Sequence, residues 1–325
     1  MEAIPSIMAQ NLLSPIVLSF ALGLFASLAR SNLSVPEAAA KALSLYLLFA
    51  IGFKGGASVT AHGLDGSLAA SLVAGVALSF VIPFVAFGLL RAMTRLSAVD
   101  AAAVAGHYGS ISIVTFVSAT AILASRAIDY EGYMVAVAAA MEAPAIIAAL
   151  WLATRAGTGA RMDRELWREV LLNGSIVLLI GAFMIGAITG ERGLKEIESF
   201  IVSPFKGVLC LFLLDMGLVA GRGLRQARSV LSPGAFAFAV LMPLVGAALA
   251  MPVAAALGLS AGGTALLMVL SASASYIAVP AAMRVALPEA NPSIYLTLSL
   301  GVTFPFNLAL GIPIYIALAE IIGGV

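Results

Sequence analysis

The segment Ser271–Pro280 reads SASASYIAVP and lies inside an otherwise apolar stretch of the chain. A second segment of small and hydroxyl side chains, Gly109–Thr115, reads GSISIVT. The tripeptide Leu-Ser-Ala precedes both segments, starting at Leu96 and at Leu259, an offset of 163 residues. Such patches midway along a hydrophobic segment indicate backbone released from regular helix, which a membrane tolerates only where it is buried in protein or lines a watery cavity. The two segments therefore predict one site built twice.

The composition of the chain places it in a lipid bilayer. Its 325 residues are 62% hydrophobic and 10% charged, with a mean hydropathy of +1.09. That leaves too little polar surface to cover a soluble domain of this size, so the sequence predicts an integral membrane protein. The net charge of +1 gives no indication of a nucleic-acid partner. The single cysteine, Cys210, lies within an apolar segment and is interpreted as a small hydrophobic residue.

Hydropathy predicts an all-α fold of ten transmembrane helices, with boundaries that follow from a window of about 19 residues. The predicted spans are 12–30, 36–53, 67–92, 98–124, 132–153, 171–190, 197–219, 233–257, 260–286 and 293–320. A polar, arginine-rich stretch at Thr154–Glu169 divides them five and five. We therefore expect a first five-helix repeat at 1–155, a cytoplasmic linker at 156–170 and a second five-helix repeat at 171–325.

Internal similarity supports this division. Lys41–Gly56 aligns with Lys206–Gly221 at an offset of 165, and Met141–Pro144 aligns with Val302–Pro305 at an offset of 161. Because each half has an odd number of spans, the second copy enters the membrane from the opposite face. Inverted repeats of this kind are typical of secondary transporters, whose binding site lies near the midplane where the repeats meet.

The basic residues of the loops predict the orientation. With the loops numbered alternately, eleven arginines collect on one side, against four basic residues on the other, Lys54, Arg126, Arg192 and Lys195. The positive-inside rule makes the arginine-rich side cytoplasmic. We expect a multi-pass protein of the cell's inner membrane with both termini extracytoplasmic.

Several motifs together make the chain resemble the sodium-dependent bicarbonate permease family over nearly its whole length. They are Val99–Ser112, Met141–Pro144, Ile51–Gly56 and Pro280–Ser293. The resemblance implies a gate domain from spans one, two, six and seven and a core domain in which spans four and nine are interrupted and cross. It also implies elevator-type movement of core against gate, a homotrimer, sodium symport and a PII-like regulatory partner.

The chain departs from the family pattern at two points of the site. Tyr276 occupies the position where the family's bicarbonate transporters have an aspartate that helps to hold sodium, which predicts weak or absent sodium dependence and a distant member of the family. The hydroxyl-rich run of the other half reads Ser112-Ile113-Val114-Thr115, which is bulkier and less polar. The central loop is also short, which weakens the inference of the PII-like partner.

The two patches supply the candidate substrate-binding residues. Their hydroxyls, together with amide donors freed where helices are interrupted, suit a small anion. No lysine or arginine lies in the central part of either patch, so weak rather than tight capture is expected. The alternative is that the serines are small residues that allow close helix packing. The predicted set is Gly109, Ser110, Ser112, Thr115, Ser273, Ala274, Ser275 and Tyr276.

Glu142 is the candidate residue for the coupling ion. An ionised side chain at its depth in span five costs about 2.5–3.5 kcal/mol, so it needs a partner or a proton. We interpret it as a sodium ligand or a proton carrier, with Thr303 and Asn307 near the matching position of span ten. The alternative is a protonated glutamate, hydrogen-bonded to backbone beside Pro144. Sodium is the only metal ion considered for coupling, and no other metal or cofactor is expected.

Three other classes of function compete with transport. An enzyme is disfavoured, because the chain has no His-Glu-x-x-His or Gly-x-Ser-x-Gly motif and its histidines, His62 and His107, lie far apart. A channel or a sensor stays open. The favoured function is an elevator-type secondary transporter of a small anion, bicarbonate by resemblance, coupled to sodium, to protons or to neither.

Overall fold

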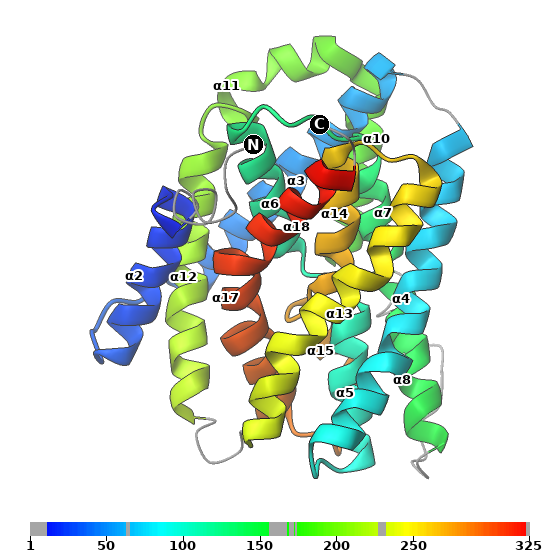
Figure 1. The fold of residues 1–325 in the computed structure, drawn as a ribbon. Coiled ribbons are helices and arrows are strands. Elements are labelled where there is room, and N and C mark those ends of the chain that lie inside the picture. The colour runs from blue at the N-terminus through cyan, green and yellow to red at the C-terminus, as the bar shows by residue number, and fades with distance from the viewer. Residues whose placement is uncertain are drawn as a thin grey trace.

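The computed structural model describes residues 12–62, 66–155, 174–226 and 232–322, together with Arg168 and Leu172. All regular elements of these residues are helices (Figure 1). The first half contains α2 (Pro15–Leu28), α3 (Glu37–His62), α4 (Gly66–Met93), α5 (Ala98–Gly109), α6 (Ile113–Ser125), α7 (Met134–Ala140) and α8 (Ala143–Arg155). The second contains α10 (Gly174–Glu196), α11 (Glu198–Ile201), α12 (Phe205–Gln226), α13 (Pro233–Leu257), α14 (Ala261–Ala272), α15 (Ala278–Ala286), α16 (Pro292–Leu296), η2 (Thr297–Thr303), α17 (Phe304–Phe306), η3 (Asn307–Gly311) and α18 (Ile312–Ile322). Apart from Arg168, the predicted linker at 156–170 lies outside the described residues.

The lengths and surfaces of these helices fit a membrane. Eight helical segments within the described part of the chain are long and apolar enough to cross a bilayer, and Pro15–Leu28 and Ala261–Ala272 are shorter apolar helices. Large apolar side chains face outward on α4, α10 and α13, where Val73 is 70% exposed, Ile188 78% and Phe236 54%. The helices α5, α6 and α14 are almost wholly buried. The outer helices thus face lipid, and the broken helices form the interior.

One predicted boundary is wrong in an informative way. The second span does not end near residue 53, because α3 continues to His62. Lys54 therefore lies inside a helix rather than at its end, and its Nζ sits 4.6 Å from the centre of the Phe205 ring. The α3 helix continues through residues that a hydropathy window excludes because they are polar or small. The sixth predicted span ends at residue 190, where Gly190 has the non-helical angles φ +60° and ψ −152°, and a further helical stretch follows as far as Glu196.

Glycines allow two pairs of helices to approach each other closely. A Cβ on Gly52 of α3 would lie 2.7 Å from the Leu179 carbonyl oxygen of α10, and one on Gly56 would collide with the Phe183 carbonyl. On α12, Gly217 and Gly221 face α2 in the same way. Figure 1 shows α2 and α12 side by side at one edge of the molecule. Both pairs are Gly-x-x-x-Gly motifs, which let membrane helices approach closely, and they stand at equivalent positions of the two aligned segments.

Two hydrogen-bonded contacts, called clasps below, join the ends of the broken helices. At the start of α5, the Asp100 carboxylate accepts a hydrogen bond of 2.8 Å from the Asn291 amide. Before α14, the Ser260 amide and hydroxyl donate to the Glu131 carboxylate at 2.7 and 3.0 Å. Each clasp joins a carboxylate of the first half to a backbone amide of the second. The four half-helices α5, α6, α14 and α15 are therefore held as one unit.

Candidate functional site

The first helix break separates α5 from α6. The helix α5 ends at Gly109, and Ser110 is extended, with φ −88° and ψ 162°. Ser112 then caps α6, because its hydroxyl accepts a hydrogen bond of 3.2 Å from the Thr115 amide. The Thr115 hydroxyl donates to the same oxygen at 2.9 Å. A serine that caps a helix satisfies one of the amides that the first turn leaves without a partner. Helix α6 can therefore begin after only three non-helical residues.

The second break separates α14 from α15 and begins with the same backbone conformation. Ser273 follows α14 with φ −87° and ψ 165°, close to the values at Ser110, which lies 163 residues earlier. The Ser273 hydroxyl donates to the Leu270 carbonyl at 3.0 Å. Within the break, the Ser275 hydroxyl accepts from the Val279 amide at 3.3 Å, in the first turn of α15. The predicted interruptions of spans four and nine are thus confirmed, and both begin at a serine.

The two breaks contact each other directly. The Ser112 amide donates to the Ser273 hydroxyl at 2.9 Å, and the Ser275 amide donates to the His107 carbonyl at 2.7 Å. The second break therefore supplies a partner for an amide of the first, and the last turn of α5 supplies a partner for an amide of the second. Buried amides without partners are costly, so this exchange stabilises two adjacent interruptions that neither helix could support alone.

Glu142 stands at a third, shorter interruption. The helix α7 ends at Ala140 and α8 begins at Ala143, and the Ser79 hydroxyl donates to the Met141 carbonyl between them at 2.5 Å. The Glu142 side chain is 5% exposed, and its Oε2 atom is buried without a hydrogen-bond partner in the described part of the structure. An ionised Glu142 in this setting would be a buried charge with no opposite charge beside it. A protonated Glu142 is neutral and needs no opposite charge.

A small cavity brings Glu142 to the two breaks. Its volume is about 10 Å³, and its polar walls include Ser112, Glu142, Ser275 and Tyr276. This volume is at the lower limit for one water molecule. The Tyr276 hydroxyl comes near Ser112 but does not reach hydrogen-bond geometry. In this conformation the cavity can hold a single water or a bare ion, and a larger substrate requires the walls to separate.

The other predicted site residues lie outside this cavity. Ser110 is buried near it with an unpaired hydroxyl, and the predicted Gly109, Thr115 and Ala274 are buried in the adjoining backbone. Gly109 packs against Pro83 of α4, where a Cβ would collide with the proline ring. These positions shape the site, whereas Ser112, Ser275 and Tyr276 line the cavity itself.

Thr303 and Asn307 do not line the cavity that contains Glu142. The Thr303 hydroxyl donates to the Ala239 carbonyl at 2.6 Å, so it receives its second hydrogen bond, also 2.6 Å, from the Tyr108 hydroxyl. The Asn307 amide donates to the Ala272 carbonyl at 2.9 Å, and its Oδ1 accepts from Tyr315 at 3.0 Å. Asn307 thus holds the last turn of α14, and neither residue lines the small cavity.

His107 is a part of the site that is absent from the predicted set. Its carbonyl is the partner of the Ser275 amide, its Nδ1 lies 2.7 Å from the Ala103 carbonyl, and its ring stacks on Tyr295 at 4.3 Å. Because a carbonyl only accepts, Nδ1 carries the proton. The position of His107 immediately before the first patch was the available signal, but nothing in the sequence indicated that its backbone reaches the second patch.

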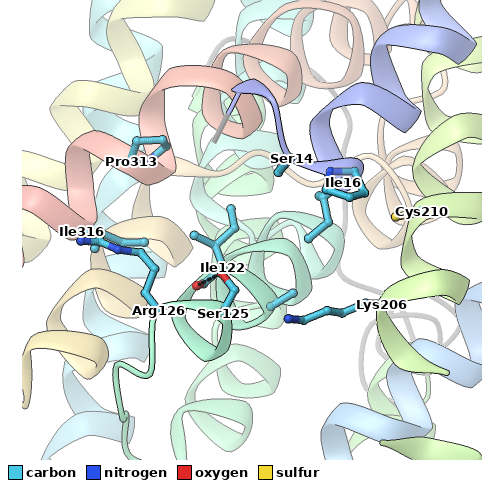
Figure 2. Close-up of a pocket in the computed structure, with 11 residues that line it drawn as sticks. Ser14, Ile16, Ile122, Ser125, Arg126, Lys206, Cys210, Pro313 and Ile316 are labelled. Atoms are coloured by element: carbon cyan, nitrogen blue, oxygen red, sulfur yellow. Dashed lines mark hydrogen bonds between the residues drawn. The ribbon is translucent and has the colours of Figure 1, made fainter. Parts of the chain in front are cut away.

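Two larger cavities lie along α12. One has a volume of about 600 Å³ and is bounded by the end of α12 and by α15, α16 and η2, with Arg222, Arg284 and Tyr276 on its walls. Tyr276 is therefore shared between this cavity and the small one. The other, of about 280 Å³, lies at the beginning of α12 beside α2, α6 and α18 (Figure 2). The helix α12 thus has a basic cavity near each of its ends.

Interrupted membrane helices that meet around a buried polar cavity are typical of membrane transporters. The model of the Na+-dependent bicarbonate transporter superfamily matches residues 15–320, and the chain belongs to that superfamily. A search of curated proteins finds no match. Membership in a transporter superfamily favours transport across a membrane over catalysis.

Proposed function

We propose that this protein is a secondary active transporter of a small anion, with bicarbonate as the first candidate because of its superfamily. The observation that carries the proposal is the mutual hydrogen bonding of the two breaks, Ser112 to Ser273 and Ser275 to His107, beside a cavity that contains Glu142. Elements of both halves of the chain form this one site, as expected for a carrier whose repeats meet at the substrate.

The breaks offer an anion several neutral donors. The helices α6 and α15 begin at this site, and the first turn of a helix has free amides and a partial positive charge. Hydroxyls of Ser112 and Ser275 line the same space. Since no lysine or arginine lines the small cavity, binding relies on dipoles rather than on full charges. Modest affinity of this kind allows release on the far side of the membrane.

Because the small cavity is closed, transport requires one part of the protein to move. A cavity of about 10 Å³ excludes a hydrated anion, so substrate reaches the breaks only when the clasped unit of α5, α6, α14 and α15 shifts against its neighbours. The glycine-packed pairs α3–α10 and α2–α12 supply the stationary gate in this proposal. An elevator movement of inverted repeats fits this division, and assembly as a homotrimer is part of the same proposal. A PII-like partner has no support beyond the resemblance.

Glu142 favours coupling to protons. It is the buried carboxyl of the small cavity, it has an unpaired oxygen, and Tyr276 adds no negative charge. A sodium ion there would have one formal negative ligand, and hydroxyls and carbonyls would replace the rest of its hydration shell. A proton neutralises Glu142 without any of these ligands. We therefore expect proton-coupled uptake with weak or absent sodium dependence.

Uptake of labelled bicarbonate into proteoliposomes tests the function. Saturable uptake should exceed that of protein-free liposomes under the same gradients, which corrects for diffusion of carbon dioxide. A proton gradient should drive accumulation, and a sodium gradient should add little. Labelled formate provides a second anion that is free of hydration equilibria. A flux that dissipates gradients without accumulation would indicate a channel, and no flux of either anion would contradict transport.

A further inference from the structure

The cavity at the beginning of α12 has a chemistry of its own. It is bounded by α12 and α2 on one side and by α6 and α18 on the other, and its volume is about 280 Å³. Figure 2 shows Lys206 extending from α12 into the cavity toward Ser125, with Arg126 on the opposite wall. The space is far larger than the 10–15 Å³ or so that one water requires, so it can hold a hydrated small molecule.

The charges around this cavity are not balanced. The Nη2 atom of Arg126 lies 3.2 Å from the Glu320 carboxylate, but its Nη1 atom is buried and has no hydrogen-bond partner within the described chain. Lys206 has no carboxylate partner among the described residues, and it is close enough to Lys54 for their charges to repel. Two cations, Lys206 and Arg126, thus line the cavity, the Glu320 carboxylate pairs with Arg126 alone, and a buried guanidinium donor lacks an acceptor. An unpaired buried cationic donor is costly, and an anion would relieve that cost.

A hydroxyl completes the set of donors. The Ser14 hydroxyl accepts from the Val17 amide at 3.3 Å, and its own proton has no acceptor in the described residues, so it is free to donate. The Ser125 hydroxyl already donates to the Ile122 carbonyl at 2.7 Å and can only accept. Lys206, Arg126 and Ser14 are the donors available to a ligand with several oxygen atoms.

We propose that this cavity is a second binding site for a small oxyanion, held by Lys206 of α12 and by Arg126 at the end of α6. The proposal rests on the proposed function, since it places the transported class of anion at a station outside the central cavity. The two cations belong to different parts, Lys206 to the glycine-packed pair and Arg126 to the clasped unit. An anion between them therefore links the two parts and binds best when they are close.

Cys210 provides a direct test, because it is the only cysteine of the chain and lines this cavity. The protein is reconstituted in phosphatidylcholine vesicles, and the conversion of Cys210 to a mixed disulfide, with release of methanesulfinate, is timed with an anionic and a cationic methanethiosulfonate reagent of similar size. We expect the anionic reagent to react faster and bicarbonate to slow both reactions. In Lys206→Gln the preference for the anionic reagent should fall about tenfold, the equivalent of about 1.4 kcal/mol.

Lys41→Gln is the matched control. Lys41 aligns with Lys206 in the internal repeat and is exposed on α3, outside the cavity, so this variant should keep the preference. Thermal stabilisation by bicarbonate, retained in Lys41→Gln and lost in Lys206→Gln, gives a second measurement that does not depend on reaction at Cys210. Equal rates for both reagents, without stabilisation by bicarbonate, would overturn the proposal.

A lipid headgroup has the same oxygen chemistry as a soluble anion, and the vesicles distinguish the two. Protection of Cys210 by bicarbonate in purely zwitterionic lipid supports the proposed site. Protection that appears only after phosphatidylglycerol is added would assign the cavity to lipid and overturn it. Because modification of Cys210 is measured without transport, protection in a protein that shows no uptake would contradict the proposed function and leave this site standing.

Discussion

The backbone amide of Ser112 donates a hydrogen bond of 2.9 Å to the hydroxyl of Ser273, 161 residues further along the chain. The same hydroxyl donates to the Leu270 carbonyl, so Ser273 joins the start of one half-helix to the end of another. Main-chain atoms of a break have few alternatives inside a membrane. The bond therefore makes the geometry of each break depend on the other.

Removing this bond should destabilise the protein in a way that a neighbouring serine does not. Ser273→Ala leaves the Ser112 amide buried without a partner, at a cost of about 1–3 kcal/mol. Ser271→Ala is the control, because the Ser271 hydroxyl is equally buried but has no hydrogen-bond partner among the described residues. Thermal unfolding in detergent compares the two. Equal losses of stability would show that the Ser112–Ser273 bond has no special role.

Glu142→Gln should abolish gradient-driven uptake and leave folding nearly unchanged. The amide has the shape of the carboxyl group but cannot carry a proton, and the unpaired Oε2 atom means that no ion pair is lost. Uptake driven by a proton gradient and exchange at equal pH on both sides are measured together. Exchange should persist when accumulation is lost. Glu37→Gln, at an exposed position of α3, serves as the control, and full accumulation by Glu142→Gln would remove the proposed role.

Tyr276→Asp should create sodium dependence. It places a second carboxylate on the wall of the small cavity beside Glu142, and two neighbouring carboxylates in a site of low polarity favour a bound cation. Asparagine has nearly the shape of aspartate without its charge, so uptake by Tyr276→Asn should not depend on sodium. The measurement is uptake as a function of external sodium at constant ionic strength. The same sodium response in both variants would show that charge at this position does not determine coupling.

Gly217→Ala should separate α12 from α2. The new Cβ would collide with the Phe20 carbonyl and lie 2.7 Å from the Leu24 amide. Overpacking of this kind costs about 1–3 kcal/mol. Gly207→Ala on the same helix has nothing within 4 Å of the added carbon and should be neutral. Melting temperatures of the two purified variants decide the point, and a neutral Gly217→Ala would show that the helix pair is loosely packed.

The orientation can be tested with single cysteines. In a Cys210→Ser background, Arg192→Cys should react with an impermeant reagent on intact cells, and Arg95→Cys should react only after permeabilisation. Both native side chains are exposed in the structure, so access differs only by the side of the membrane. The reverse pattern would invert the topology that the arginine distribution predicts.

The sequence predicted the helix breaks because their cause is local. Small residues and hydroxyls at Ser110 and Ser273 disfavour continuation of the helix within an apolar segment, and the pattern occurs twice. Partner choice was not predictable, since the bond from the Ser275 amide to the His107 carbonyl depends on how two distant segments pack. The wide π-helical turns between Thr297 and Gly311 were also missed, because hydropathy reports composition and not hydrogen-bond register.

Thr303 and Asn307 were predicted to share the coupling-ion role of Glu142 because they lie near its matching position in span ten. In the structure they bond to the Ala239 and Ala272 carbonyls, and neither lines the small cavity. These partners depend on how distant segments pack. Equivalence in sequence therefore predicts similar local environments, and it does not predict contact.

The two clasps, Asp100 to Asn291 and Glu131 to Ser260, also constrain how the protein is made. When synthesis of the first half is complete, the Asp100 and Glu131 carboxylates and the Ser112 amide still lack their partners from the second half, Asn291, Ser260 and Ser273. The first half therefore remains in the membrane without these contacts until residue 291 has been synthesised. Separately expressed halves should be degraded quickly, whereas co-expressed halves should protect each other. Maturation of this protein is thus an assembly reaction between two pieces that happen to be joined by one chain.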